Sequence, residues 1–282
     1  MNNAHSLINQ LIQLQELIAA KMQKKVSMQN ARLDELENSI AALSSDLSPS
    51  VKTHINRLLQ KNPEAIVAVV NGNCSGCGMA LTKSLVQAVI KAENLSRCPN
   101  CTRFLFEPAF KIERDNVTRQ YGKIQKNGIE RYSSPELMTL PLKGNSPEEV
   151  LGQLSNRMAE NGFTKNPEQL KDLALQREAI VSTAVDNGLA FPHVRGVEGG
   201  GLAMAVGVSK KGVKFDSSRR SLTRIFFFVV IPTATSAFYL KLISQLSRTF
   251  RDKEARESLV NASSEKELWK NFIKSTKKTL SQ

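Results

Sequence analysis

The chain has 282 residues, 41% hydrophobic and 23% charged, which is the composition of a folded protein with one or two domains. Its longest apolar run, at 225–232, is far shorter than the about 20 residues of a membrane span, and no charged-then-apolar leader begins the sequence. We therefore expect a cytoplasmic protein without membrane insertion. The net charge of +13 is spread as +1 over residues 1–60, +5 over 61–135 and +7 over 136–282. This charge is compatible with a nucleic-acid or an acidic protein partner and demonstrates neither.

The first part of the chain has a helical pattern. Apolar residues recur every three or four positions at 7–18 and again at 33–47, with a strict heptad broken near Met22. Pro49 then begins a second, shorter helix. A long helix cannot bury its apolar stripe alone, so we expect a coiled-coil hairpin or a homodimer through the coiled coil. Packing of the stripe against the rest of the chain is the alternative.

The four cysteines form two Cys-x-x-Cys pairs separated by twenty residues: Cys74 with Cys77, and Cys98 with Cys101. This spacing is typical of a zinc site, because each tight turn directs two thiolates at one ion. Four thiolates complete a tetrahedral zinc and leave no position for water, so the zinc is expected to be structural. Two disulfides are the alternative, which a cytoplasmic location disfavours.

The segment 71–106, together with the helical lead-in, resembles a family of bacterial zinc-ribbon proteins that carry an N-terminal coiled coil. The likeness covers residues 1–106 and is carried by CSGC, by the apolar helix between the pairs and by CPNCTRFLF. Members of that family commonly have glycine after the last cysteine, where this chain has Thr102. The resemblance implies a module that binds a protein or a nucleic acid.

The second half of the chain has a different pattern. Ser146 and Pro147 begin a helix, and further helices alternate with the apolar segments GLAFP, LAMAVGVS and RIFFFVVIP. We expect a multidomain protein: an N-terminal α-helical coiled coil with a C4 zinc ribbon, then a layered α/β domain with a mixed sheet flanked by helices. The expected divisions are a coiled coil at 1–62, the ribbon at 63–107, a polar linker at 108–135 and the α/β domain at 136–282.

His193 is one of only three histidines, and it follows Pro192 where a short strand is expected to end. The other two, His5 and His54, lie in polar, helical sequence. A histidine in this place is either an ordinary loop residue or an imidazole presented to a partner. A neutral imidazole is a nucleophile at cytoplasmic pH, so the second alternative has a defined chemistry.

The segment 174–196 resembles the IIA domain of the mannitol/fructose class of the phosphoenolpyruvate-dependent sugar phosphotransferase system, including its nitrogen-regulatory relatives. The matching features are Arg-Glu at 177–178, Ser-Thr at 182–183, the glycine before the strand and Pro-His at its end. The likeness continues through the helix of Trp269. The resemblance implies that His193 is the phosphorylated residue and that Arg177 is the active-site arginine, which would bind phosphoryl oxygens.

The resemblance also marks candidates for supporting roles. Ser182 and Thr183 would hydrogen-bond the imidazole or, alternatively, cap a turn, and Arg195 adds a positive charge beside the histidine. Relatives commonly carry a second histidine near the first, at a position where this chain has Tyr239. Tyrosine can donate a hydrogen bond but stays protonated at neutral pH, which affects onward transfer of phosphate more than phosphorylation itself.

Two functions follow from these features. The first is a phosphoryl carrier that accepts phosphate on His193 from the histidine phosphocarrier protein and passes it to a IIB component in trans or holds it as a signal. The fused coiled coil and ribbon favour a regulatory role over bulk sugar uptake. The second is a non-enzymatic interaction protein in which a degenerate IIA-like domain is only a sensor. The sequence shows neither the sugar, if there is one, nor the imidazole nitrogen that would be modified.

Overall fold

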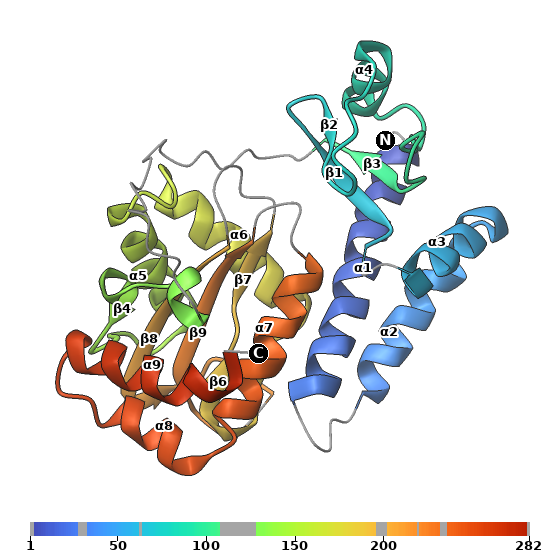
Figure 1. Ribbon diagram of the computed structural model, residues 1–282. Coiled ribbons are helices and arrows are strands. Elements are labelled where there is room, and N and C mark those ends of the chain that lie inside the picture. Colours follow the sequence, from blue (N-terminus) through green and yellow to red (C-terminus); the bar gives the residue numbers. More distant parts are fainter. Residues whose placement is uncertain are drawn as a thin grey trace. The chain divides into compact units, whose positions relative to one another are not determined.

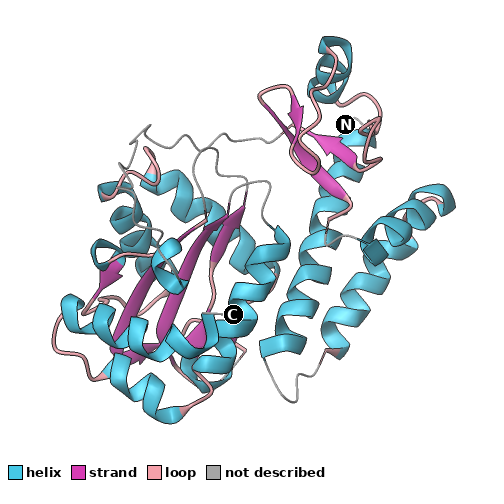
Figure 2. Cartoon of the chain, in the orientation of Figure 1, coloured by secondary structure: helices cyan, strands magenta, loops and turns pink. Residues whose placement is uncertain are grey.

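The computed structural model describes residues 3–27, 33–61, 64–107, 128–195, 202–218, 220–231 and 236–280. Apart from two short segments, most of residues 1–111 form one compact unit and most of residues 112–282 form a second. Figure 1 labels the elements of both units, and Figure 2 shows that the first combines helices with a small sheet whereas the second has a larger sheet with helices around it.

The first unit begins with the helices α1 (Asn3–Ser27), α2 (Asp34–Ser45) and α3 (Pro49–Lys61). α1 and α2 run antiparallel, because Gln10 Nε2 donates to Leu43 O at 2.9 Å while Lys21 pairs with Glu37 at 2.7 Å. The pattern predicted at 7–47 is therefore two helices of a hairpin, with the junction at 28–32 outside the described residues. Pro49 begins α3, as predicted.

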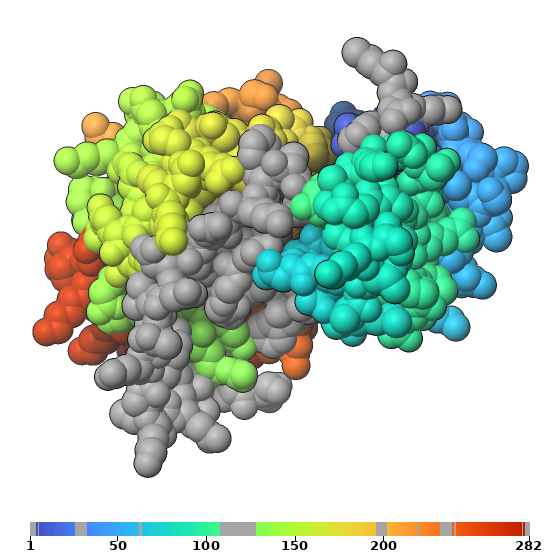
Figure 3. Space-filling model, turned by 90° about the horizontal axis from the view of Figure 1, so that it is seen from above, coloured from blue at the N-terminus to red at the C-terminus, as the bar shows by residue number. Residues whose placement is uncertain are grey.

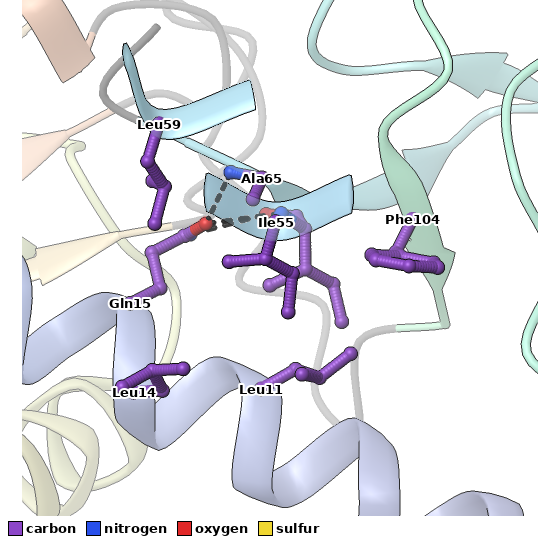
Figure 4. A pocket seen from close by; sticks show the side chains of 8 residues that line it. Leu11, Leu14, Gln15, Ile55, Leu59, Ala65 and Phe104 are labelled. Carbon is purple, nitrogen blue, oxygen red and sulfur yellow. Dashed lines mark hydrogen bonds between the residues drawn. The ribbon is translucent and has the colours of Figure 1, made fainter. Parts of the chain in front are cut away.

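The apolar stripe of α1 is buried within this unit. Its Ile8, Leu11 and Leu14 share a core cluster with residues of α3 and of the zinc-ribbon segment. Gln15 adds a polar contact to the ribbon: its Oε1 accepts from the backbone N–H groups of Ala65 and Ile66 at 2.7 and 3.0 Å (Figure 4). Both intramolecular arrangements considered from the sequence, a hairpin and packing against the following segment, are thus present together.

The zinc-ribbon segment is a small sheet with one helix. Its strands lie in the order β2-β1-β3, with β1 antiparallel to β2 and parallel to β3. The elements are β1 (Ile66–Val70), β2 (Asn73–Cys74), α4 (Lys83–Lys91) and β3 (Phe104–Phe106). Thr82 caps α4 by accepting from Leu85 N, and most residues of the helix are exposed. Figure 3 shows this part of the chain, in teal, on the face in view.

The second unit is built on a six-stranded mixed sheet of order β4-β8-β9-β6-β5, in which β7 also pairs with β9. β8 and β9 are antiparallel, whereas β4 is parallel to β8 and both β6 and β7 are parallel to β9. The strands are β4 (Met138–Thr139), β5 (Ala184–Val185), β6 (Leu189–Ala190), β7 (His193–Arg195), β8 (Ala203–Val213) and β9 (Thr223–Ile231).

Helices cover both faces of this sheet. From Ile225 to Ile231 every side chain of β9 is at most 1% exposed, which requires a packed layer on each side. The helices and 3-10 turns are η1 (Gly128–Arg131), η2 (Pro135–Leu137), α5 (Pro147–Glu160), α6 (Pro167–Ile180), η3 (Asp186–Gly188), α7 (Ser236–Thr249), α8 (Lys253–Val260) and α9 (Glu265–Leu280). The predicted layered α/β fold with a mixed sheet is confirmed, as is the start of α5, where Ser146 accepts from Glu149 N.

The start of the second unit and one of its helices differ from the sequence-based expectations. The linker expected at 108–135 lies outside the described residues as far as 127, but η1 and η2 follow, and Ile129 is 2% exposed within the core of the second unit. This folded unit therefore starts before residue 136. α8 was not expected, because eight residues rich in charge carry a weak periodic signal.

The longest apolar run of the sequence lies in β9, a strand of nine residues. Within the ranges that the structure describes, no helix combines enough length and hydropathy to cross a membrane.

Candidate functional site

The four cysteines lie at the ends of two tight turns. In the first turn Gly78 N donates to Cys74 O at 2.7 Å, and Gly78 has φ +75°. In the second, Thr102 N donates to Cys98 O at 3.0 Å, and Thr102 has φ +60° although it is β-branched. Both turns therefore use the left-handed backbone that glycine adopts most easily.

The sulfur atoms of these turns form one cluster. The Sγ–Sγ distance is 3.7 Å between Cys74 and Cys101 and also between Cys77 and Cys98, and all four atoms lie within 4.8 Å of one another. These distances exceed the about 2.05 Å of a disulfide. The two distances of 3.7 Å match the edge of about 3.8 Å expected for a tetrahedron with Zn–S bonds of about 2.3 Å.

Two of the four thiols are harder to ionise than a free cysteine, and one is easier to ionise. Burial raises the pKa of Cys74 and also that of Cys98. Burial acts in the same direction on Cys77, but the N–H of Met79 and neighbouring donors lower the pKa of that thiol to about 6. Four thiolates around zinc would form a closed, structural site that supplies folding energy and no catalytic water.

His193 lies where a strand of the second unit is interrupted. β6 and β7 both pair in parallel with β9, and the two residues between them, Phe191 and Pro192, interrupt this pairing. Pro192 lacks an N–H, but its carbonyl accepts from Val229 N at 2.9 Å. His193 therefore begins a short strand beside Val229, whereas the sequence suggested that it follows the end of one. A three-residue strand after a proline has too short a pattern to be predicted.

Three groups hold the imidazole of His193. Arg177 Nε donates to Nε2 at 3.2 Å, while the hydroxyl of Tyr239 and the carbonyl of Phe191 lie 2.8 and 3.2 Å from Nδ1. Since the guanidinium can only donate, Nε2 must be the acceptor and carry the lone pair. In a neutral ring the proton is then on Nδ1, where Phe191 O and Tyr239 Oη accept it. The hydrogen-bond partners thus assign the tautomer.

The surroundings keep this ring uncharged. Burial, together with the positive charges of Arg177 and Arg195, holds the pKa of His193 well below its ordinary value. The residue is 1% exposed and Arg177 is 8% exposed. A neutral imidazole with a defined lone pair can act as a nucleophile, provided that the arginine side chain moves from Nε2.

Arg177 and Arg195 make different contacts around His193. Arg177, near the end of α6, also donates from Nη1 to Val181 O at 3.0 Å, which fixes its direction. The guanidinium carbon of Arg195 lies 5.7 Å from the ring centroid of Tyr239, within cation–π distance. The structure therefore brings Arg177, Tyr239 and Arg195 together around His193.

Ser182 and Thr183 contact a carboxylate in the structure. The hydroxyls of both residues donate to Glu178 at 2.8 Å, and the backbone N–H of Thr183 donates to the same carboxylate at 2.6 Å. Burial raises the pKa of Glu178, although these three hydrogen bonds lower it. These contacts fix the turn after α6. Two carbonyls of this turn accept hydrogen bonds, Val181 O from Arg177 and Thr183 O from the N–H of Phe191.

Sequence reasoning missed the role of Glu178 and the carbonyl of Phe191. Glu178 was noted only as part of the Arg-Glu pair. A polar cluster of glutamate followed four and five residues later by Ser and Thr is a signal for such a turn, because both hydroxyls can reach back to the carboxylate. A backbone carbonyl leaves no comparable trace in a sequence.

Both halves of the chain match known protein families. Residues 131–275, which are more than half of the chain, match the family "Phosphoenolpyruvate-dependent sugar phosphotransferase system, EIIA 2", and the chain belongs to this family. Residues 73–105 match the C4-type zinc ribbon domain. The predicted structural zinc is confirmed by this match together with the sulfur cluster.

Named proteins resemble the same half of the chain. The fructose-specific EIIA component of Haloferax volcanii is 26% identical over 129 residues, which are 46% of this chain and 84% of that protein. The fructose-specific EIIABC component of Bacillus subtilis is 26% identical over 126 residues, 45% of this chain but only 20% of that protein. The solved structure of the nitrogen regulatory protein IIA-Ntr from Neisseria meningitidis is 22% identical with a TM-score of 0.46, covering 51% of this chain and 97% of that one.

Proposed function

We propose that this protein is a phosphoryl carrier with a regulatory role and that it accepts a phosphoryl group on Nε2 of His193. The hydrogen bond from Arg177 Nε to His193 Nε2, at 3.2 Å, carries the proposal. It leaves the lone pair on that nitrogen and holds a guanidinium beside it. The match of residues 131–275 to the EIIA 2 family favours this function over an interaction protein with a degenerate IIA-like domain.

The transfer is a displacement at phosphorus. The lone pair of His193 Nε2 attacks the phosphoryl group of a donor phosphohistidine, a P–N bond forms to Nε2, and the donor's P–N bond breaks. The electron pair of the broken bond stays on the donor imidazole. The proton on Nδ1 of His193 takes no part in bond making, and its hydrogen bonds to Phe191 O and Tyr239 Oη orient the ring.

Arg177 has two tasks in this reaction. Because His193 is 1% exposed and its Nε2 is occupied by the guanidinium, the arginine side chain must move before phosphorus can approach. A short movement keeps the guanidinium next to Nε2, where its forked donors can bind the equatorial phosphoryl oxygens. While its guanidinium is bound to Nε2, Arg177 protects the nucleophile. After it has moved, it stabilises the negative charge of the phosphoryl group.

The proposal includes a donor and an acceptor for the phosphoryl group. The donor is the histidine phosphocarrier protein, and the acceptor is the cysteine of a IIB component in trans, unless the phosphate is held as a signal. The helical hairpin and the zinc ribbon are the part of the chain that would read such a signal, through a homodimer or by binding a protein or nucleic acid. Zinc, held by Cys74, Cys77, Cys98 and Cys101, would keep the ribbon folded.

The test is phosphorylation of the full, zinc-loaded chain by labelled phosphoenolpyruvate through the purified general proteins of a phosphotransferase system. We expect an acid-labile, alkali-stable label on the wild type and none on His193→Gln. His54→Gln is the matched control, because His54 is also buried, at 8% exposure, but lies in α3 of the first unit. It should keep the label.

Two results would count against the proposal. One is the absence of label on folded wild-type protein with donors that do phosphorylate a known IIA domain. The other is an undiminished label on His193→Gln, which would place the phosphate on a different residue.

A further inference from the structure

The two acceptors at Nδ1 of His193 differ in what they can do. The carbonyl of Phe191, at 3.2 Å, can only accept a hydrogen bond. The hydroxyl of Tyr239, at 2.8 Å, can accept one or donate one. Tyr239 is 1% exposed, and its ring lies 4.8 Å from the imidazole, so its position beside Nδ1 is set by packing.

The distinction matters once Nε2 carries a phosphoryl group. With Nδ1 protonated, the ring is cationic, and loss of the phosphoryl group leaves a neutral imidazole because the P–N electron pair goes to Nε2. With Nδ1 unprotonated, the same cleavage leaves an imidazolate, which is a much poorer leaving group. The protonation of Nδ1 therefore sets the rate at which water or an acceptor protein takes the phosphoryl group.

We propose that Tyr239 is a positioning residue that prolongs the life of the phosphoryl group on His193, by donating its O–H to Nδ1 whenever that nitrogen has lost its proton. This inference rests on the proposed function. In the unphosphorylated protein the same hydroxyl accepts from Nδ1–H. A single side chain thus stabilises the reactive tautomer before transfer and the slow-leaving form of the ring after it.

The charged side chains around the ring favour the unprotonated form of Nδ1, as the hydroxyl of Tyr239 does. Among the described residues, the charged groups that bear on His193 are Arg177 of α6 and Arg195 of β7, and both disfavour a cationic ring. Val229, its neighbour on β9, is apolar. Arg195 also lies over the face of Tyr239, which fixes the phenol beside the imidazole. The negative phosphoryl group opposes these charges, and a donor at Nδ1 shifts the balance toward the unprotonated ring.

The experiment measures loss of labelled phosphate from the full, zinc-loaded chain between pH 5 and pH 9 after the donor proteins are removed. Tyr239→Phe leaves only the accepting carbonyl at Nδ1, which favours the protonated ring. We expect it to lose phosphate about 2- to 10-fold faster than wild type at pH 8, the effect of one hydrogen bond, with the difference shrinking toward low pH as Nδ1 becomes protonated in both proteins. The midpoint of its pH profile should move upward.

Two further variants make the result specific. Tyr132→Phe removes a tyrosine hydroxyl elsewhere in the same unit and should behave as wild type. Tyr239→His restores a side chain that can donate or accept, so it should return the profile toward wild type. Tyr239→Leu, which also lacks a hydroxyl, takes the place of Tyr239→Phe if that variant does not fold. Equal profiles for wild type and both Tyr239 variants overturn the inference while leaving the carrier function intact. Failure of the wild type to take phosphate overturns both.

Discussion

At the scale of single residues, the buried neutral state of His193 has a measurable cost in acid. Its pKa in the folded chain is held well below the ordinary value. As the pH falls through about 6.5, this histidine therefore binds a proton in the unfolded chain but not in the folded chain. The contribution of this residue to stability is complete above the unfolded pKa and is lost as the pH falls below it. His193→Gln should therefore unfold with a flatter dependence on pH between 7 and 5.

The measurement is the free energy of unfolding by denaturant at several pH values, followed by the signal of the second unit. A difference of one bound proton between the unfolded and folded chains changes the free energy of unfolding by about 1.4 kcal/mol per pH unit, so the difference in slope between wild type and variant is detectable. His54→Gln provides the comparison, since it removes a histidine of the other unit. Parallel pH dependences for wild type and His193→Gln would show that His193 takes up a proton in the folded chain.

Residues whose chemistry depends on type and spacing could be identified from the sequence, whereas their partners could not. The Cys-x-x-Cys pairs carry their geometry in the sequence because each turn closes within four residues. Phe191 O and Glu178 act through contacts that form only when a strand is interrupted and a turn closes. The same is true of Ser182 and Thr183, whose hydroxyls reach Glu178 and not the imidazole.

At the scale of elements, the second cysteine turn carries strain that the first avoids. Thr102 has φ +60° where the first turn has Gly78 at φ +75°. A non-glycine residue in this region costs about 1–3 kcal/mol, against about 0.5–1 kcal/mol for the greater flexibility of unfolded glycine. Thr102→Gly should raise the stability of the zinc-loaded ribbon by about 1 kcal/mol, measured as a higher chelator concentration needed for half-release of zinc.

The control is the same replacement at Thr82, which caps α4 with φ −64°. Glycine relieves no strain there and removes a side-chain cap, so Thr82→Gly should leave stability unchanged or slightly lower. A loss of zinc retention in Thr102→Gly equal to that in Thr82→Gly would mean that the turn tolerates threonine without cost.

The long elements were predictable and the short ones were not. β8 and β9 appear as apolar runs because both faces of each strand are buried over most of its length. α5 has a serine cap, proline at its first position and a clear apolar period. β4, β5 and β7 have two or three residues each, and β4 and β7 pair with strands that lie far away in the chain, whereas β5 pairs with the equally short β6 close by. No local pattern of that length distinguishes strand from loop.

At the scale of the whole molecule, the two units have separate cores. The cluster of the second unit contains residues from Ile129 to Phe272, and those of the first contain residues from Ile8 to Leu105. Within the first unit the ribbon and the helices share polar contacts as well: His54 Nε2 donates to Thr102 O at 2.8 Å, next to the last cysteine, and Gln15 binds the start of β1. We therefore propose that helices and ribbon unfold together and that the second unit unfolds on its own.

Removal of zinc tests this division. Chelation, or Cys98→Ser, takes away the ion that holds the two cysteine turns and should release Phe104 and Ile66 from the shared core with α1 and α3. In calorimetry one of two transitions should fall or disappear, with a loss of helical circular dichroism, while the second transition and phosphorylation of His193 persist. Added zinc should restore the first transition in the chelated wild type but not in Cys98→Ser. If both transitions move together, or if labelling is lost with the metal, the ribbon and the histidine-bearing unit are energetically coupled, and zinc then supports the phosphoryl carrier directly.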